Sequence, residues 1–379
     1  MSVKVSIIIP VYNKEEYIEK CLQSVIVQTL EDIEIIIIDD GSTDNSAEIC
    51  KRYLSDSRVR YIFKHNEGLA AARQDGIEYS NGEYIGFVDS DDWIEPEMFQ
   101  RMYNVATRQN ADVVMCGMYK DESQKTREYL LHGVYNKSQI ENIIIPGFLG
   151  ELTDQGTPYI INYSNCTKLF LRKTIIENQA FFDKEILLSE DLPFSIRTAL
   201  SAKIYVSICN EYYYHYRLDN NEVSLSRGYK KDFWKKYEML IQKLNKIVEE
   251  TNLTHLNYNM QLCTFFLSEL VVKNEYSTNQ IKRKEKILKL NELAHSELIK
   301  KALQFVPKDK LNSHYRIIYD ALMCDDGGQM YRYLRKSKAY VVPKENRRII
   351  FKKKLKTVKT KALKYKAIAG LNDIVRHRG

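Results

Sequence analysis

Cysteine pairs, long apolar runs and glycine-rich phosphate loops are all missing from this sequence of 379 residues. Seven cysteines are scattered singly with no CxxC pair, which argues against a disulfide framework or a zinc site and favours buried, reduced thiols. No run of eighteen or more apolar residues occurs, so the sequence predicts no membrane-spanning helix. Signal-peptide character is also missing from the N-terminus, and we therefore expect a cytoplasmic protein.

The sequence has a net charge of +7, but its charged residues are distributed unevenly along the chain. Residues 332–379 hold 17 basic against 2 acidic residues, whereas residues 1–331 hold 40 basic and 48 acidic residues. The tail places its apolar residues on one narrow helical stripe, formed by Phe351, Leu355, Val358, Ala362, Tyr365 and Ala369. This pattern predicts a basic amphipathic helix, which either packs on the body of the protein or lies on an anionic membrane surface. We favour the membrane, and no recognised module supports binding to nucleic acid.

Two periodicities alternate along the first 120 residues. Near-continuous apolar runs at 3–12, 33–39, 59–64 and 82–89 are typical of strands covered on both faces, and helical patterns lie between them. This βαβαβαβ order predicts an α/β fold with a mostly parallel, Rossmann-like sheet and helices on both faces. From about residue 229 onward the pattern is mainly helical.

Polar residues follow each of the four predicted strands, in the segments PVYN (10–13), DDGSTD (39–44), KHNEG (64–68) and DSDD (89–92). Carboxyl ends of parallel strands meet at one edge of an open sheet, and ligands bind there. PVYN is neither a GxGxxG motif nor a Walker loop, which argues against a nicotinamide site or a P-loop.

Three carboxylates within four positions, Asp89, Asp91 and Asp92, would repel a bare phosphate. They would hold a phosphate bridged by a divalent cation, because hard cations take one or two carboxylates plus phosphate oxygens. Asp40 is suited to accept a hydrogen bond from a base N–H or a ribose hydroxyl. The alternative is an acidic first turn for a helix that begins near Pro96. That alternative accounts for one acid better than for three, so the spacing favours a metal–nucleotide site.

SIIIPVYN, DDGSTDNS, NEGLAAARQDGIEYSNGEYIGFVDSDD and SEDLPF occur in this order over roughly residues 3–217. Together they resemble the family 2 glycosyltransferases of the GT-A fold. The resemblance implies inverting transfer of a sugar from a nucleotide diphosphate donor, usually UDP-linked, with Mn²⁺ or Mg²⁺ as cofactor. The QxxRW motif of processive members is missing, which favours the addition of single sugars.

The resemblance also implies roles on the nucleotide side of the site. Pro10, Tyr12 and Asp40 would frame the base and the ribose, and Asn66 and Arg73 would close that pocket.

The DSDD segment resembles the DxD motif of the family, formed here by Asp89, Ser90 and Asp91. Asp91 would be the direct metal ligand, and Asp89 would face the ribose or a metal-bound water. Asp92 would contact the donor sugar.

SEDLPF resembles the segment that carries the general base of the family. Asp191 would take the proton from the acceptor hydroxyl, and Glu190 would orient the base or a donor hydroxyl. Ser189 followed by two acids is also an ordinary helix start, but its order after DSDD favours the catalytic role.

YYYHYR resembles the closing segment of the family, where a histidine can complete the metal shell. His215 is a candidate metal ligand or a satisfied core residue, and both readings stay open. Arg217, two residues on and hence on the same face of a strand, is a candidate contact for the diphosphate.

The resulting hypothesis is a glycosyltransferase that acts on a glycan, lipid-linked or teichoic-acid acceptor at the inner face of the cell membrane. We expect a catalytic domain at 1–226, a helical acceptor-side or homo-oligomerisation region at 227–331 and the basic tail at 332–379. A nucleotidyltransferase of similar fold, or a non-catalytic nucleotide-sugar-binding protein on the membrane, is the alternative.

Overall fold

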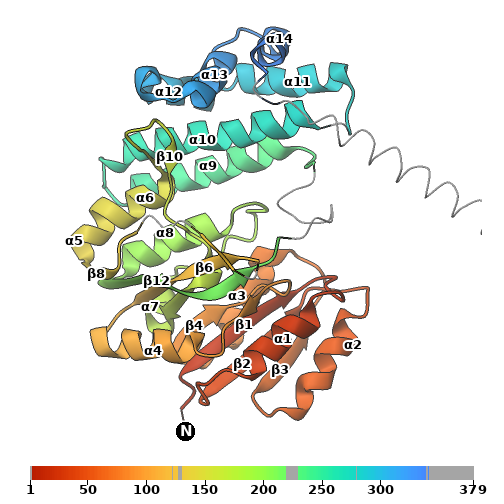
Figure 1. Ribbon diagram of the computed structural model, residues 1–379, viewed down its shortest axis with the longest axis vertical. Helices are drawn as coiled ribbons and strands as arrows, with labels where there is room; N and C mark the ends of the chain where they lie inside the picture. Colours follow the sequence, from red (N-terminus) through yellow and green to blue (C-terminus); the bar gives the residue numbers. More distant parts are fainter. Residues whose placement is uncertain are drawn as a thin grey trace, which may run out of the picture.

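The computed structural model describes residues 2–121, 123–126, 130–218, 229–278, 280–338 and 340. They form a mixed sheet of ten strands below a stack of helices (Figure 1). The strand order is β3-β2-β1-β4-β11-β6-β12-β5, with β7 paired to β6 and β8 paired to β12. The expected boundary near residue 226 and the apolar stripe of the basic tail lie outside the described residues.

Strands β1 to β4 form the parallel half of the sheet, as the sequence predicts. Pro10 lies opposite Ile38 and Val11 opposite Asp39, so the first two strands end at the same level. The elements of this half are β1 (Val5–Val11), α1 (Ile18–Ile26), β2 (Ile33–Asp39), α2 (Ser46–Lys51), η1 (Arg52–Ser55), β3 (Val59–Phe63), α3 (Leu69–Tyr79) and β4 (Tyr84–Phe87).

Helices cover both faces of this parallel half, because neighbouring residues of a buried strand point to opposite sides. Ile36 and Ile38 of β2 pack with Ala72 of α3. Ile35 of β2 belongs instead to the main core, which also contains Leu22 of α1. Helix α3 and strand β1 lie so close that a Cβ atom on Gly76 would come within 2.3 Å of the Ile8 side chain.

The other half of the sheet is mixed in direction. β11 (Lys168–Leu171) inserts antiparallel between β4 and β6 (Val113–Lys120), and β12 (Ile204–Tyr216) runs parallel to β6. The register of β12 shifts between Ile208 and Tyr214, and the strand then reaches β5 (Trp93–Ile94). This long strand therefore carries its last residues to the segment that follows β4.

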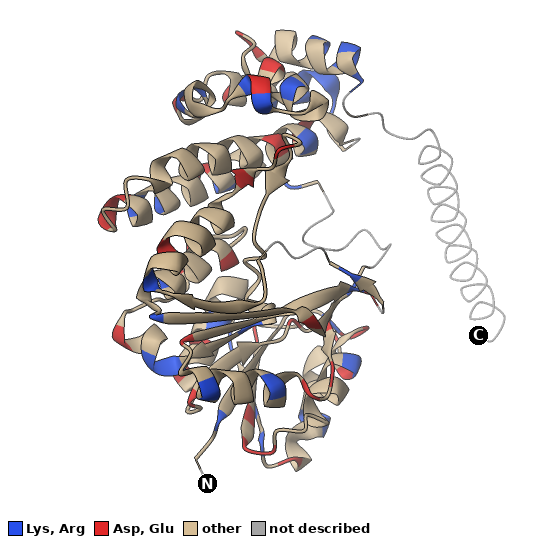
Figure 2. Ribbon diagram, turned by 60° about the vertical axis from the view of Figure 1, so that its left-hand side comes forward, with Lys and Arg blue, Asp and Glu red and all other residues tan. Residues whose placement is uncertain are grey.

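Short elements and helices complete this part of the chain. They are α4 (Met98–Gln109), β7 (Gln124–Lys125), β8 (Gly133–Asn136), α5 (Lys137–Gln139), the π-helix η2 (Ile140–Ile144), α6 (Ile145–Leu149), β9 (Glu151–Leu152), β10 (Pro158–Tyr159), η3 (Asn165–Thr167), α7 (Arg172–Glu177) and α8 (Asp191–Ser201). Most charged residues lie on the surrounding helices and loops, and the central strands contain few of them (Figure 2).

The described residues after 229 are helical, as predicted. They form α9 (Phe233–Glu250), α10 (Leu256–Ser277), α11 (Arg283–Ala294), α12 (Glu297–Phe305), η4 (Lys308–Lys310), α13 (Ser313–Leu322) and α14 (Gly327–Ser337). Helices α9 and α10 form a layer between the sheet with its own helices and the outer group α11 to α14 (Figure 1). No helix in the described part of the chain is long and apolar enough to cross a membrane.

Candidate active site

The loops after β1 and β2 are joined at the carboxyl end of the sheet. The backbone N–H of Asn13 donates to Oγ of Ser42 at 3.1 Å, and the N–H of Thr43 donates to Oδ1 of Asn13 at 2.8 Å. Pro10 is buried in β1, whereas Tyr12 stands exposed at this rim. The loops therefore form one surface, on which the side chain of Tyr12, one of the predicted nucleotide contacts, is exposed.

Asp40 joins a third loop to this rim. Its Oδ1 accepts from the backbone N–H of Glu67 at 2.9 Å and its Oδ2 accepts from Gly68 at 2.8 Å. Asn66 lies beside Gly41, whose positive φ of 79° leaves the backbone of Asn66 close to the DDG turn. Burial raises the pKa of Asp40 although both of these hydrogen bonds lower it. Asp40 thus holds the loop that positions Asn66.

The three acids of DSDD have three different partners. Oδ1 of Asp89 accepts from Nη2 of Arg73 at 2.7 Å, whereas Oδ2 of Asp91 is paired with Nζ of Lys14 at 2.5 Å. Asp92 is buried, and its partners are Tyr214 and Arg217. Helix α4 begins only at Met98 without a side-chain cap, so none of these acids caps it.

Asp92 is fixed by the end of β12. The hydroxyl of Tyr214 donates to its Oδ2 at 2.6 Å, and the backbone N–H of Arg217 donates to its Oδ1 at 2.8 Å. Burial, followed by the charges of Asp91 and Asp89, raises the pKa of Asp92 well above its ordinary value. Ser90, two residues before Asp92 in the sequence, is also buried. The predicted contact of Asp92 with the donor sugar would have to form beside these hydrogen bonds.

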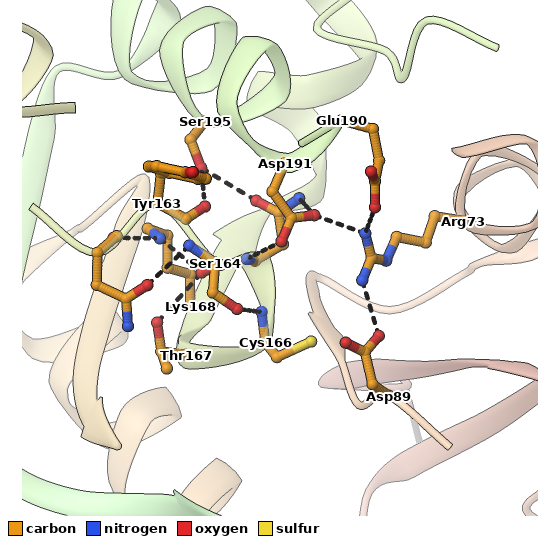
Figure 3. Close-up of polar contacts among 12 residues, drawn as sticks. Arg73, Asp89, Tyr163, Ser164, Cys166, Thr167, Lys168, Glu190, Asp191 and Ser195 are labelled. Atoms are coloured by element: carbon orange, nitrogen blue, oxygen red, sulfur yellow. Dashed lines mark hydrogen bonds and ion pairs between the residues drawn. The ribbon is translucent and has the colours of Figure 1, made fainter. Parts of the chain in front are cut away.

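The predicted base lies at the start of α8, after Ser189 in a left-handed conformation with φ of 55°. Oδ1 of Asp191 accepts from Nη1 of Arg73 at 2.5 Å and from Nδ2 of Asn165 at 2.8 Å (Figure 3). The same Nη1 donates to Oε1 of Glu190 at 2.7 Å. Arg73 therefore connects SEDLPF to the DSDD segment.

Burial has the largest effect on the pKa values of both acids in SEDLPF. It raises the pKa of Glu190 to about 7, against the opposing charge of Arg73. It also raises the pKa of Asp191, with Arg73 again acting in the opposite direction. A carboxylate whose pKa is raised is a stronger proton acceptor, which suits a general base.

His215 is enclosed by aromatic rings at the end of β12. It stacks between Trp93 and Tyr119, with ring centroids 4.9 and 4.7 Å away. Its Nε2 lies 2.7 Å from Oε1 of Glu95, and its Nδ1 lies 2.9 Å from the carbonyl oxygen of Asp121. Both ring nitrogens thus have partners, and a metal-ligand role would require the release of one of them.

Arg217 lies on the outer side of the DSDD segment. Its Nε donates to the carbonyl oxygen of Asp91 at 2.7 Å, and its guanidinium lies 5.0 Å from the ring centroids of Tyr17 and Trp93. It lines a depression of about 520 Å³ together with Lys20, Trp93, Lys120, Asp121, Ser123 and Gln124. The position next to Asp91 is compatible with the predicted contact to a diphosphate.

Lys14, Asn165 and Tyr214 belong to the site, although the sequence patterns did not single them out. Lys14 directly follows PVYN, so its place in the first loop was a usable signal. Asn165 and Tyr214 meet Asp191 and Asp92 only through long-range contacts. Lys168, which the sequence left unassigned, is buried and donates to the carbonyl oxygen of Ser164 at 2.6 Å, next to Asn165.

Few side chains of the site are available to hold a metal ion. Within the described residues, no group of three or more His, Cys, Asp or Glu side chains lies in a metal-binding arrangement. Asp91 is paired with the flexible ammonium of Lys14, whereas Asp89 is paired with the buried guanidinium of Arg73, and the side chain of Asp91 is 36% exposed. A metal held here would therefore depend on oxygen atoms from its substrate.

Comparison with known proteins gives a consistent result. The model of glycosyl transferase family 2 matches residues 6–177. The uncharacterized glycosyltransferase EpsJ of Bacillus subtilis (strain 168) is 32% identical over 316 residues, which is 80% of this chain and 87% of EpsJ. A poly(ribitol-phosphate) beta-glucosyltransferase of Bacillus spizizenii is 32% identical over 64% of this chain and 37% of its own length.

Among solved structures, S. aureus TarS 1–349 in complex with UDP-GlcNAc is similar with a TM-score of 0.64. The similarity covers 88% of this chain and 92% of that one, at 20% sequence identity. At this identity the likeness shows the fold. Together with the family match, it confirms the expected α/β GT-A fold followed by a mainly helical C-terminal region.

Proposed function

The chain belongs to glycosyl transferase family 2, and we propose that it transfers a sugar from a UDP-sugar to a hydroxyl of a cell-surface acceptor, with inversion at the anomeric carbon. Membership of this family decides against the nucleotidyltransferase hypothesis. The observation that carries the proposal is the guanidinium of Arg73, which contacts both Asp89 of DSDD and Asp191 of SEDLPF. A donor-side acid and a candidate base are therefore held in one site.

The nucleotide would occupy the rim formed by Pro10, Tyr12, Asp40 and Asn66. This rim lies at the carboxyl end of the parallel strands, where open α/β sheets bind their ligands. Because Asp40 already holds the loop of Asn66, the rim is preformed before any donor arrives. The UDP-GlcNAc complex of TarS supports a UDP-sugar as the donor.

A divalent cation, Mn²⁺ or Mg²⁺, fits this donor site. Such cations are commonly held by one or two carboxylates plus substrate phosphates, so Asp91 with Asp89 nearby is sufficient on the protein side. When bound, the cation would neutralise the charge that develops on the diphosphate leaving group. Lys14 would release Asp91, and its ammonium and the guanidinium of Arg217 would then be free to attract the diphosphate.

Asp191 would act as the general base. Its Oδ1 accepts from Arg73 and from the side chain of Asn165. Among the described residues, its Oδ2 accepts only a long hydrogen bond of 3.3 Å, from the Asn165 backbone. Oδ2 is therefore the oxygen better placed to take the proton of the acceptor hydroxyl as that oxygen attacks the anomeric carbon. Glu190 would keep the base oriented through its contact with Arg73.

For the acceptor, we propose a teichoic-acid, glycan or lipid-linked chain. The relative named as a poly(ribitol-phosphate) beta-glucosyltransferase supports this class. An acceptor at the membrane also agrees with the basic tail predicted from the sequence, which would bring the enzyme to the inner face of the cell membrane. That tail lies outside the described residues from 341 onward, so peripheral association stays a prediction.

The test is a donor and acceptor screen with the full chain. UDP-, GDP- and dTDP-sugars are incubated with Mn²⁺, with and without poly(ribitol phosphate), and both the released nucleoside diphosphate and the labelled polymer are measured. We expect release from one UDP-sugar and incorporation of its sugar into the acceptor. Release and transfer from none of these donors would contradict the proposal.

A further inference from the structure

Arg73 is unusual for a residue expected to contact a nucleotide, because its side chain is only 1% exposed. It lies in the middle of α3, which packs against β1 and β2, and a run of three alanines precedes it. Its head group therefore points into the protein and away from the surface of the rim. A buried guanidinium persists only when carboxylates compensate its charge.

Three carboxylates from two distant segments surround this guanidinium (Figure 3). Nη2 contacts Asp89, which is 16 residues away in the sequence. Nη1 contacts Glu190 and Asp191, which are 117 and 118 residues away. The remaining donor, Nε, is buried and has no partner among the described residues. Both terminal nitrogens are thus committed to protein carboxylates.

This arrangement constrains the positions of the bound carboxylates, because a guanidinium group is rigid and planar. Carboxylates bound to its two terminal nitrogens are held at a fixed mutual distance and orientation. Burial opposes the charge of Arg73, but the charges of Asp191, Asp89 and Glu190 raise its pKa above the ordinary value. Arg73 therefore stays charged across the usual pH range.

We propose that Arg73 is a positioning residue that fixes the base Asp191 relative to the donor-side Asp89. This inference rests on the proposed function, and it replaces the expected contact of Arg73 with the nucleotide. As a consequence, the geometry in which the acceptor hydroxyl attacks the anomeric carbon would depend on Arg73, whose two terminal nitrogens bind Asp89 and Asp191. A misplacement of about 1 Å at a reacting group can cost about 100-fold in rate.

The experiment compares Arg73→Lys and Arg73→Met with the wild-type enzyme. Lysine keeps the positive charge but cannot hold three carboxylates in fixed geometry, and methionine removes the charge. We measure kcat for sugar transfer, the Kd for UDP with Mn²⁺ by calorimetry, and the melting temperature. Arg58→Lys serves as the matched control, because Arg58 also binds a carboxylate and a carbonyl oxygen but lies outside the site.

We expect kcat to fall about 100-fold in Arg73→Met and less in Arg73→Lys, whereas Kd for UDP changes less than about threefold. Because Arg73 lowers the pKa of Asp191, its removal should also move the acid limb of the kcat profile to higher pH. An increase in Kd with unchanged kcat would make Arg73 a donor contact and overturn the inference. A lower melting temperature with unchanged kcat per folded molecule would also overturn it.

A double-substitution cycle tests the link itself. If Arg73 transmits the position of Asp89 to the base, Asp89→Asn should reduce kcat much less in the Arg73→Met background than in the wild type. Equal fold-losses in both backgrounds would show that the two carboxylates act independently. A wild-type protein without transfer activity would contradict the proposed function, whereas an active wild type with fully active Arg73 variants would contradict this inference alone.

Discussion

The proposed donor side and the proposed base side of the site differ in how their carboxylates are held in place. Asp91 on the donor side is 36% exposed, and its partner is the flexible ammonium of Lys14. Asp191 on the base side is 17% exposed and is held by the guanidinium of Arg73 and the amide of Asn165. The donor side can exchange its cation, whereas the base side is fixed before any substrate binds.

The difference matches the two tasks of a glycosyltransferase site. A carboxylate that must receive a metal and a diphosphate needs access and a replaceable partner. A general base needs a fixed direction and a pKa raised toward the working pH. The following predictions separate the two sides by their measurable effects.

Asp191→Asn should give the largest effect. An amide cannot accept the proton of the acceptor hydroxyl, so we expect kcat for transfer to fall by about 10²- to 10⁴-fold. Affinity for UDP with Mn²⁺ should remain unchanged, as measured by calorimetry. Asp154→Asn is the control, because Asp154 is an exposed carboxylate in the β9–β10 hairpin. Normal turnover in Asp191→Asn would refute the assignment of the base.

Asp91→Asn should act on the donor side instead. We expect the affinity for Mn²⁺ in the presence of UDP to fall at least about tenfold, since even outer partners of metal ligands cost this much. The thermal stabilisation by UDP with Mn²⁺ should be lost accordingly. Asp32→Asn removes a comparable lysine pair, with Lys4 at 2.7 Å, and should retain this stabilisation. Full stabilisation of Asp91→Asn would mean that another group holds the metal.

Tyr214→Phe tests the buried support of the donor side. The substitution leaves Oδ2 of Asp92 without the hydroxyl at 2.6 Å, and we expect a loss of about 1–3 kcal/mol in the free energy of unfolding. Tyr213→Phe removes a partly buried hydrogen bond to Glu211 and should cost less than about 1 kcal/mol. Urea denaturation of both variants measures the difference. Equal losses would indicate that Asp92 does not depend on Tyr214.

Glu190→Gln should give the smallest effect, a change in the pH dependence of stability. Burial raises the pKa of Glu190 from its ordinary 4.5 to about 7, so between these values the folded state binds a proton that the unfolded state has released. This group therefore makes the protein less stable as the pH rises from 4.5 to 7. Between pH 4.5 and 7 the slope of the unfolding free energy against pH should therefore become more positive in Glu190→Gln, by at most the contribution of one titrating group. An unchanged slope would contradict the raised pKa.

The parallel half of the fold could be predicted well because its signals are local. Buried strands, helix periodicity and the polar strand ends each occupy a short stretch of the sequence, and parallel strands bring their ends to one edge. The predicted residues Pro10, Tyr12, Asp40 and Asn66 do lie along that edge.

The other half required information that periodicity does not contain. No local pattern specifies that β11 runs antiparallel between β4 and β6. The contacts of Arg73 with Glu190 and Asp191 span more than a hundred residues, so spacing alone could not reveal them. The rings that enclose His215 belong to Trp93 and Tyr119, which are distant in the sequence, so the tyrosines beside His215 in the sequence could not reveal them.

Helix α10 has a practical consequence for anyone who shortens this protein. Its buried residues include Leu262, Phe265 and Val271, and the side-chain amide of Asn259 donates to the carbonyl oxygen of Gly150 at 3.1 Å. The helix lies in the layer between the sheet with its own helices and the outer group α11 to α14 (Figure 1). A catalytic part expressed without α9 and α10 would expose the apolar surface that these helices cover and would be prone to aggregation. A chain that ends after α10 would in turn expose the side of this helix that packs against α11 and α12, so soluble expression calls for a chain that extends through α14.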